Sequence, residues 1–293
     1  MLPRMDVLVK KNDGSEKRIC LLDSSEASLH MPIAVSRFVA EIRKTEGEFP
    51  SGYEDEIRIR SLWEHASDAL VYEWFMQTEV LDSYDAYAVF DDYNREAAEG
   101  FMRDSVGRQG QSVMPATSVT CGYPPDEFGP MSSSGLPSWV VCEAKAFSYG
   151  EIFYPFLLIN MDGHGDRESG CLQHATDECM VASSFSVDKV NKLNQRLAER
   201  SSDGQFQVLN SAVFSIVLNG AVARVFITHA WDENTDHMYT IGSVLLEDPE
   251  HNKRFRGLIQ SICKWGTTER LQGIINAISA VEKSGPRWYP RYE

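Results

Sequence analysis

Pro125-Asp126, followed by Ser138-Trp-Val-Val-Cys-Glu-Ala-Lys-Ala-Phe147, is the stretch that most strongly constrains the fold. The second segment is apolar and rich in β-branched residues, so it predicts a strand. Glu143 and Lys145 lie two residues apart and would therefore share one face of that strand. Charges on a buried strand are costly unless they pair, bind a metal or take part in chemistry. With Asp126 folded back beside the strand, three ionic groups are expected to meet at one point.

Three such groups fit the hydrolysis of a phosphodiester, which needs a metal-held water and neutralised phosphate charge. Asp126 and Glu143 would each give a carboxylate oxygen to Mg²⁺ or Mn²⁺, and the backbone carbonyl of Ala144 would give a third ligand. Lys145 would orient the water and stabilise the developing charge. Two alternatives stay open. Glu143 and Lys145 could form a salt-bridge lattice on a solvated sheet face, and Asp126 could be a turn residue after proline.

The chain resembles the fungal PD-(D/E)XK nuclease-like domains of the restriction-endonuclease-like superfamily. Pro125-Asp126 and Val140-Val-Cys-Glu-Ala-Lys145 carry the resemblance, together with a late hairpin in Val213–Trp231 and closing helices in Phe255–Ile278. The resemblance implies an α/β (α+β) fold, in which a mixed β-sheet is flanked by helices. One helix would precede the sheet, and another would follow the strand that carries the E-x-K motif.

The same resemblance implies roles for individual residues. The metal ligands of the family would fall on Asp126 and Glu143, and its catalytic lysine on Lys145. A glutamate on an early helix often joins the site in this superfamily, and Glu56 is the closest match, with Glu64 as the runner-up.

A glutamine on the helix after the motif strand would fall on Gln173, which could equally be a solvated helix residue. The chain departs from the family's pattern here, because Ser148–Glu168 separates the expected motif strand from that helix. This segment contains the apolar run Phe153–Asn160. Either the run is an extra strand or the helix assignment is shifted.

The order of patterns along the chain predicts four regions. They are a loosely ordered segment over 1–30 with a short strand at Met5–Lys10, a helical region over 31–110 that packs on the core, the core itself over 111–283, and a tail over 284–293.

Periodicity predicts the individual elements. Helices are expected at Pro32–Arg43, Glu54–Thr78, Tyr84–Met102, Glu168–Arg200, His251–Trp265 and Thr267–Lys283, the last two separated at Gly266. Besides the motif strand, strands are expected at Ser118–Gly122, Phe206–Leu218, Ala221–Trp231 and His237–Leu246. Asn219-Gly220 predicts a hairpin between two of these strands.

Composition limits the partners. The net charge of −15 disfavours nucleic acid, although residues 251–293 hold eight basic and three acidic side chains. Six cysteines without a C-x-x-C pair favour reduced thiols. No apolar run reaches the length of a membrane span, and no signal-peptide core begins the sequence. A nuclear or cytoplasmic protein is therefore expected, unless a leader has been removed.

Two functions follow as hypotheses. The first is a metal-dependent nuclease, or a nuclease-like protein, that hydrolyses DNA or RNA. The alternative is a catalytically inactive nuclease-fold protein that binds a protein partner, such as an intracellular effector or a regulatory factor. The acidic charge and the lack of a Lys/Arg-rich stripe beside the motif favour the alternative.

Overall fold

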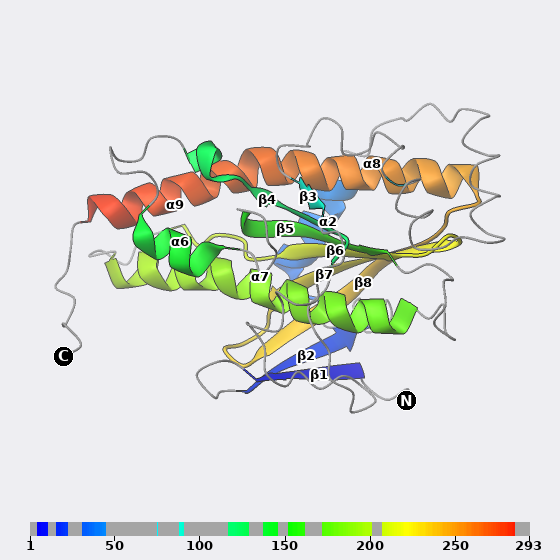
Figure 1. Ribbon diagram of the computed structural model, residues 1–293, viewed down its shortest axis with the longest axis horizontal. Coiled ribbons are helices and arrows are strands. Elements are labelled where there is room, and N and C mark those ends of the chain that lie inside the picture. Colours follow the sequence, from blue (N-terminus) through cyan, green and yellow to red (C-terminus); the bar gives the residue numbers. More distant parts are fainter. Residues whose placement is uncertain are drawn as a thin grey trace.

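The computed structural model describes residues 5–10, 16–22, 31–44, 75, 88–90, 117–128, 137–145, 152–161, 172–200 and 207–284. Its framework is an eight-stranded mixed sheet with the order β1-β2-β8-β7-β6-β5-β4-β3 (Figure 1). The strands are β1 (Met5–Lys10), β2 (Glu16–Leu22), β3 (Ala88–Phe90), β4 (Val119–Tyr123), β5 (Phe153–Met161), β6 (Val213–Leu218), β7 (Val222–Ala230) and β8 (Thr235–Leu245).

Helices cover both faces of this sheet, so the expected mixed α/β architecture is confirmed (Figure 1). The long helix α7 (Leu172–Arg200) packs on one face, across β5, β6 and β7. Helices α2 (Ile33–Lys44), α8 (Pro249–Trp265) and α9 (Leu271–Lys283) lie on the other. The pairs β2–β8 and β5–β6 are parallel, and the remaining neighbours are antiparallel. Because α7 connects the parallel strands β5 and β6, these three elements form a βαβ crossover.

Strand β6 shows why the centre of the sheet is apolar. All six of its residues are buried, because helices cover both of its faces. Phe214 points to the α2 and α8 side, where its ring lies 5.7 Å from that of Trp265. Val213 and Val217 alternate to the α7 side.

The hairpin predicted at Asn219-Gly220 is confirmed between β6 and β7. The Asn219 side-chain Oδ1 accepts hydrogen bonds from the backbone N–H groups of Ala221 (2.9 Å) and Val222 (2.8 Å). This Asx-type bonding satisfies two backbone N–H groups in the turn, where the β6–β7 ladder ends. The first strand is shorter than expected and begins at Val213.

The closing helices are present, but the predicted break at Gly266 is wrong. Asp248 caps α8 by accepting from the backbone N–H of Glu250 and His251, ahead of Pro249. The helix then runs through a π-helical turn, η3 (Gly266–Arg270), directly into α9. Gly266 keeps helical dihedral angles. Its Cβ, if present, would meet ring carbons of Phe156 at 2.5 and 2.6 Å, so close packing and not chain reversal requires glycine there.

The N-terminal part of the chain differs from the prediction. The strand Met5–Lys10 is confirmed, but β2 was missed, and its parallel pairing with β8 places part of the supposedly loose segment 1–30 in the main sheet. The helix at Pro32–Arg43 is confirmed as α2.

Between α2 and β4 little of the chain is described. Ala88–Phe90 is a strand, so the helix predicted over Tyr84–Met102 is wrong at those residues. The rest of that helix, and the helix predicted over Glu54–Thr78 apart from the buried, helical Phe75, lie outside the described residues.

Within the described ranges, no helix combines the length and the apolar character needed to cross a membrane.

Candidate functional site

The segment expected to be the motif strand is a helix, so that prediction is wrong. Ser138–Ala144 forms α6, which begins after Pro137 and ends at Lys145, whose ψ of 136° is extended. A seven-residue apolar run fits either a strand or a helix. Here Val140 and Ala144 are buried while Cys142 between them is exposed, which fits one face of a helix, whereas a strand would place all three side chains on the same face.

Glu143 of α6 is held by an arginine from α7. The Arg196 Nε donates to one Glu143 oxygen at 2.6 Å, and an Arg196 terminal nitrogen donates to the other. The Arg196 guanidinium also lies 4.9 Å from the ring centroid of Trp139, one helical turn before Glu143. Both carboxylate oxygens therefore dock α6 on α7. The salt-bridge alternative placed Glu143 and Lys145 on a sheet face. In the structure Glu143 does form an ion pair, but it lies on a helix and its partner is Arg196.

The other members of the expected triad lie apart from this pair. Asp126 is exposed on η2 (Pro125–Phe128), a short 3₁₀ turn after β4, and within the described residues it makes no hydrogen bond or ion pair. Lys145 forms an isolated bridge to Phe153 at the start of β5. Ala144 is fully buried in the core. The geometry around Glu143 does not fit a Mg²⁺ site, because a guanidinium occupies the carboxylate that would hold the ion.

The remaining predicted residues lie elsewhere. Gln173 is half-buried in the first turn of α7, where the sequence placed it on a helix. Glu56 and Glu64 lie outside the described residues. Among those that are described, no group of three or more His, Cys, Asp and Glu side chains is placed to hold a metal ion.

The strand that leads towards α7 is β5, and a buried polar cluster lies where the two elements meet. The Asn160 amide donates to Glu178 Oε2 at 2.8 Å, and His174 Nε2 lies 3.1 Å from Glu178 Oε1. Asn160 and Glu178 are each 7% exposed. Sequence reasoning missed this cluster. The i,i+4 spacing of His174 and Glu178 on a predicted helix was the available signal.

The backbone of Tyr154, the second residue of β5, is strained. Its φ is 47°, in the left-handed region, although Pro155 follows and Tyr154 is 1% exposed. Burial raises the pKa of the Tyr154 hydroxyl well above its usual value, and the Glu143 carboxylate raises it further. Packing around the buried Tyr154 thus holds the beginning of β5 in this backbone conformation.

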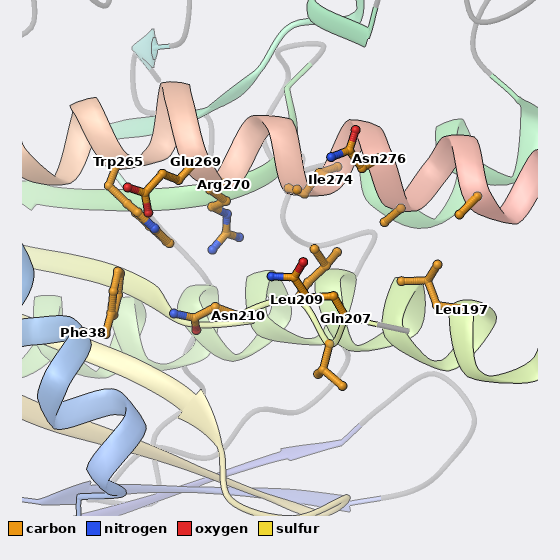
Figure 2. A pocket seen from close by; sticks show the side chains of 14 residues that line it. Phe38, Leu197, Gln207, Leu209, Asn210, Trp265, Glu269, Arg270, Ile274 and Asn276 are labelled. Carbon is orange, nitrogen blue, oxygen red and sulfur yellow. The ribbon is translucent and has the colours of Figure 1, made fainter. Parts of the chain in front are cut away.

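A cavity of about 500 Å³ lies between the start of α9, the C-terminal part of α7 and residues 207–210. Figure 2 shows Arg270 projecting from the helix into the space above residues 207–210, with Phe38 and Trp265 at one end and Leu197 at the other. Its volume is within the usual range of small-molecule sites.

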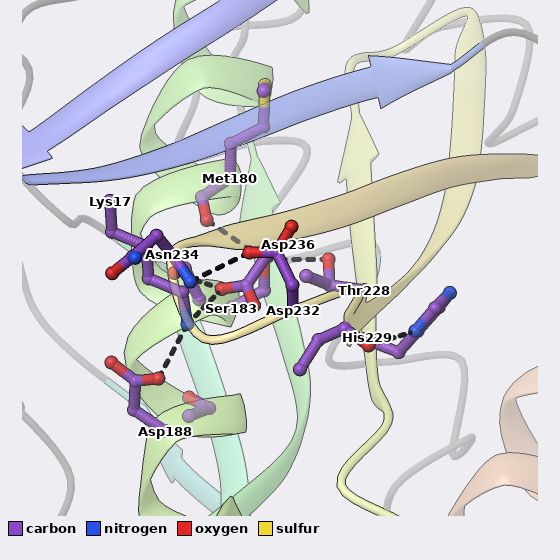
Figure 3. A network of polar contacts seen from close by, with 12 residues as sticks. Lys17, Met180, Ser183, Asp188, Thr228, His229, Asp232, Asn234 and Asp236 are labelled. Atoms are coloured by element: carbon purple, nitrogen blue, oxygen red, sulfur yellow. Dashed lines mark hydrogen bonds and ion pairs between the residues drawn. The ribbon is translucent and has the colours of Figure 1, made fainter.

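A second buried network ties the N-terminal hairpin to the core (Figure 3). The Lys17 ammonium lies 2.6 Å from an Asp188 oxygen and 2.7 Å from an Asp236 oxygen, and the Ser184 hydroxyl donates to Asp236. Burial alone would lower the pKa of Lys17, but the two carboxylates outweigh it and raise that pKa. Burial raises the pKa of Asp236 to about 6. The network therefore joins β2 to α7 and β8 within the core.

On the other face of β7 and β8 lies a ladder of rings. His229 stacks on Tyr239 with centroids 5.4 Å apart, and Trp231, which is 51% exposed, stacks on His237 at 4.7 Å. His229 Nδ1 is 2.8 Å from the Ala230 carbonyl oxygen, so this nitrogen carries the proton. Burial lowers the pKa of His229, and the hydrogen bond to Ala230 offsets only part of that effect.

We expect His229 to make the protein less stable in mild acid. Because its folded-state pKa lies below the unfolded value of about 6.5, its contribution to stability is complete above that pH and is lost as the pH falls towards the folded-state pKa. His229→Phe keeps the stacked ring and removes the titration. The free energy of unfolding, measured by urea denaturation, should then fall less steeply between pH 7 and pH 5 than in the parent. Equal slopes in that window would contradict this, and the two curves should run parallel between pH 8 and pH 9.

A family model described as a domain of unknown function (DUF7924) matches residues 102–278, which include β4 to β8 and most of the closing helices. No curated protein matches the chain.

Proposed function

Since the chain belongs to the DUF7924 family, whose description leaves the activity open, we propose its function from the fold and the site: it is a nuclease-fold protein that binds a protein partner and does not hydrolyse phosphodiesters. The order β4, β5, α7, β6, β7 and two closing helices supports the nuclease-like core. In this arrangement β5 occupies the place of the motif strand, because β5 is the strand that α7 follows.

The end of β5 carries this proposal. A strand in the motif position would be expected to carry a carboxylate and a lysine two residues apart, but this one runs Asn160-Met161-Asp162. The Asn160 side-chain amide also donates a hydrogen bond to Glu178. The E-x-K tripeptide at Glu143–Lys145 cannot substitute, because it lies on α6 and its glutamate is bound by Arg196. The described residues of β5, Phe153–Met161, therefore include neither the lysine nor the carboxylate that metal-assisted hydrolysis uses.

Charge supports a protein partner over nucleic acid. A net charge of −15 opposes approach to a phosphate backbone, which is recognised mainly by Lys and Arg. The exposed Trp231, stacked on His237, offers instead an aromatic contact of the kind enriched at protein interfaces.

The proposal is tested by a cleavage assay with single-stranded DNA, double-stranded DNA and RNA in millimolar Mg²⁺ or Mn²⁺. The parent protein should cleave no more than Asp126→Ala, Lys145→Ala or Glu178→Gln. Metal-dependent cleavage by the parent that disappears in Asp126→Ala or Lys145→Ala would restore the nuclease hypothesis with its original site. Cleavage that disappears only in Glu178→Gln would place an active site at the β5–α7 junction.

A metal titration with a matched variant sharpens this test. Asn160→Asp is nearly isosteric, but it replaces the donor to Glu178 with a second buried carboxylate, which should lower the free energy of unfolding by about 2 kcal/mol. Millimolar Mn²⁺ should restore the melting temperature of this variant and leave that of the parent unchanged. Stabilisation of the parent by Mn²⁺ would contradict the proposal, because it would show that the unmodified site binds metal.

A further inference from the structure

We propose that the cavity beneath α9 binds a small organic monocarboxylate with an apolar body, and that Arg270 receives its carboxylate. This inference concerns a different site from the β5–α7 junction. It does not depend on whether the chain cleaves phosphodiesters.

Arg270 is a buried cation whose charge is not neutralised by the protein. It is 5% exposed, and within the described residues no carboxylate lies at ion-pair distance from it. Burial lowers the pKa of Arg270, and Tyr123 is the side chain that offsets this effect. An unpaired charge at such depth is costly, and an anionic ligand would relieve the cost.

Structural hydrogen bonds account for only part of the guanidinium. One terminal nitrogen donates to the Ala212 carbonyl and the other to the Pro155 carbonyl at 3.0 Å, which ties the helix to the starts of β6 and β5. Arg270 Nε is also buried, and it finds no hydrogen-bond partner among the described residues. The Tyr123 hydroxyl, which donates to the Gly266 carbonyl, also interacts with the Arg270 side chain. A role in packing thus explains the other contacts of the guanidinium and leaves the Nε donor unexplained.

The surroundings of Arg270 are shaped like a ligand site. Trp265 lies against the guanidinium, which is 5.3 Å from its ring centroid, and the two residues line the same cavity. Leu197, Leu209 and Ile274 supply apolar walls further along (Figure 2). Arg270 ends the π-helical turn η3, a local distortion that is frequent at functional sites.

The wall opposite α9 is fixed in advance of any ligand. Asn194 of α7 donates to the Leu209 carbonyl at 3.0 Å and accepts from the Leu209 N–H at 2.9 Å. Asn210 Oδ1 accepts from the Ala212 N–H at 3.0 Å. Leu209 and Asn210, at the end of the segment that leads to β6, are therefore held in place. A preformed wall lowers the entropy that a ligand must lose on binding.

The charge count selects a monoanion. Arg270 is the single cationic side chain among the residues that line the cavity, and the exposed Glu269 lines it too. Glu269 repels any anion, and it repels a phosphate dianion about twice as strongly as a carboxylate, so a single negative charge suits the one guanidinium better. The apolar walls then require an aromatic or aliphatic body.

The test compares 4-phenylbutyrate with its neutral amide, using isothermal titration calorimetry and thermal melting. The acid should bind the parent roughly tenfold more tightly than the amide, because a charge-assisted hydrogen bond forms only with the acid. Arg270→Gln should remove this preference. Glu269→Gln should tighten binding of the acid about twofold and leave the amide unchanged, since an exposed charge acts weakly through solvent.

A variant that closes the cavity provides the steric control. A Cβ added at Gly273 would lie 3.2 Å from Leu209 Cδ2, so Gly273→Leu should fill the space between α9 and residues 207–210 and abolish binding of both compounds. If Arg270→Gln fails to fold, the proposal is still tested by the Glu269→Gln variant and by the comparison of the acid with the amide in the parent protein. Equal affinity for the two compounds, or no binding of the acid at 10 mM, would overturn the proposal.

Discussion

Lys17→Met is expected to lower the free energy of unfolding by about 3–5 kcal/mol, because it leaves the buried Asp236 carboxylate and the partly exposed Asp188 carboxylate without their cation. Lys17 is 1% exposed and Asp236 is 0% exposed, so water cannot replace the lost ammonium. Urea denaturation measures the loss. Hydrogen exchange should show it first in β1 and β2, since β2 joins the core through its pairing with β8 and its contacts with α7.

A neighbouring ion pair serves as the matched control. Arg18 is the next residue on β2 and pairs with Asp6 of β1 through its Nε at 2.8 Å, but the Arg18 side chain is 50% exposed. Arg18→Met should therefore cost less than about 1 kcal/mol. Adding Asp236→Asn to Lys17→Met should recover part of the loss, because it removes one of the stranded charges and keeps an acceptor for Ser184. A loss below 1 kcal/mol in Lys17→Met would show that the network is not buried as described.

Gly122→Ala is expected to be the most damaging of the small substitutions, at about 3 kcal/mol. A Cβ at Gly122 would overlap Ile152 Cγ2 and would lie 2.8 Å from the Phe153 carbonyl oxygen and 3.3 Å from Pro155 Cα. Two of these neighbours are backbone atoms of β5, so the strand itself would have to move. Gly122 also lies at the irregularity in the β4–β5 ladder, where the two backbones approach.

Gly242 of β8 provides the control for this substitution. It too is a strand glycine beside a ladder irregularity, but nothing lies within 4 Å of where its Cβ would be. Gly242→Ala should change the free energy of unfolding by less than about 0.5 kcal/mol. Thermal melting of the two variants side by side gives the contrast, and similar melting temperatures would contradict the packing argument.

Local pattern was sufficient where an element's own residues decide its form. Asn219-Gly220 predicted the β6–β7 hairpin, because the turn needs an asparagine whose side chain bonds the following N–H groups. Periodicity over His251–Trp265 predicted α8, and the mainly apolar run Phe153–Asn160 forms most of β5. The prediction of a break at Gly266 was wrong because a residue far away in the sequence decides the role of this glycine. The glycine is there for the Phe156 ring, which is remote in sequence.

The candidate site was less predictable than the fold. Glu143 and Lys145 seemed to require a shared function because a strand would place them on one face. The pairing that decides the role of Glu143 comes from Arg196, 53 residues away. Likewise, the sequence does not reveal that Arg270 lacks a nearby carboxylate among the described residues. Its ion-pair partners depend on the tertiary structure and not on sequence spacing.

The sequence by itself determined the mixed α/β class, the hairpin, the long helix α7 and the closing helices, since hydrophobic period and turn chemistry act over a few residues. Only the tertiary structure decided that Ser138–Ala144 is a helix, that β5 is the strand α7 follows, and that Lys17 belongs in the core. A short apolar run suits either a helix or a strand, and a charge can be buried or exposed. Contacts between residues far apart in the chain make both choices, through the burial that they permit and the partners that they supply.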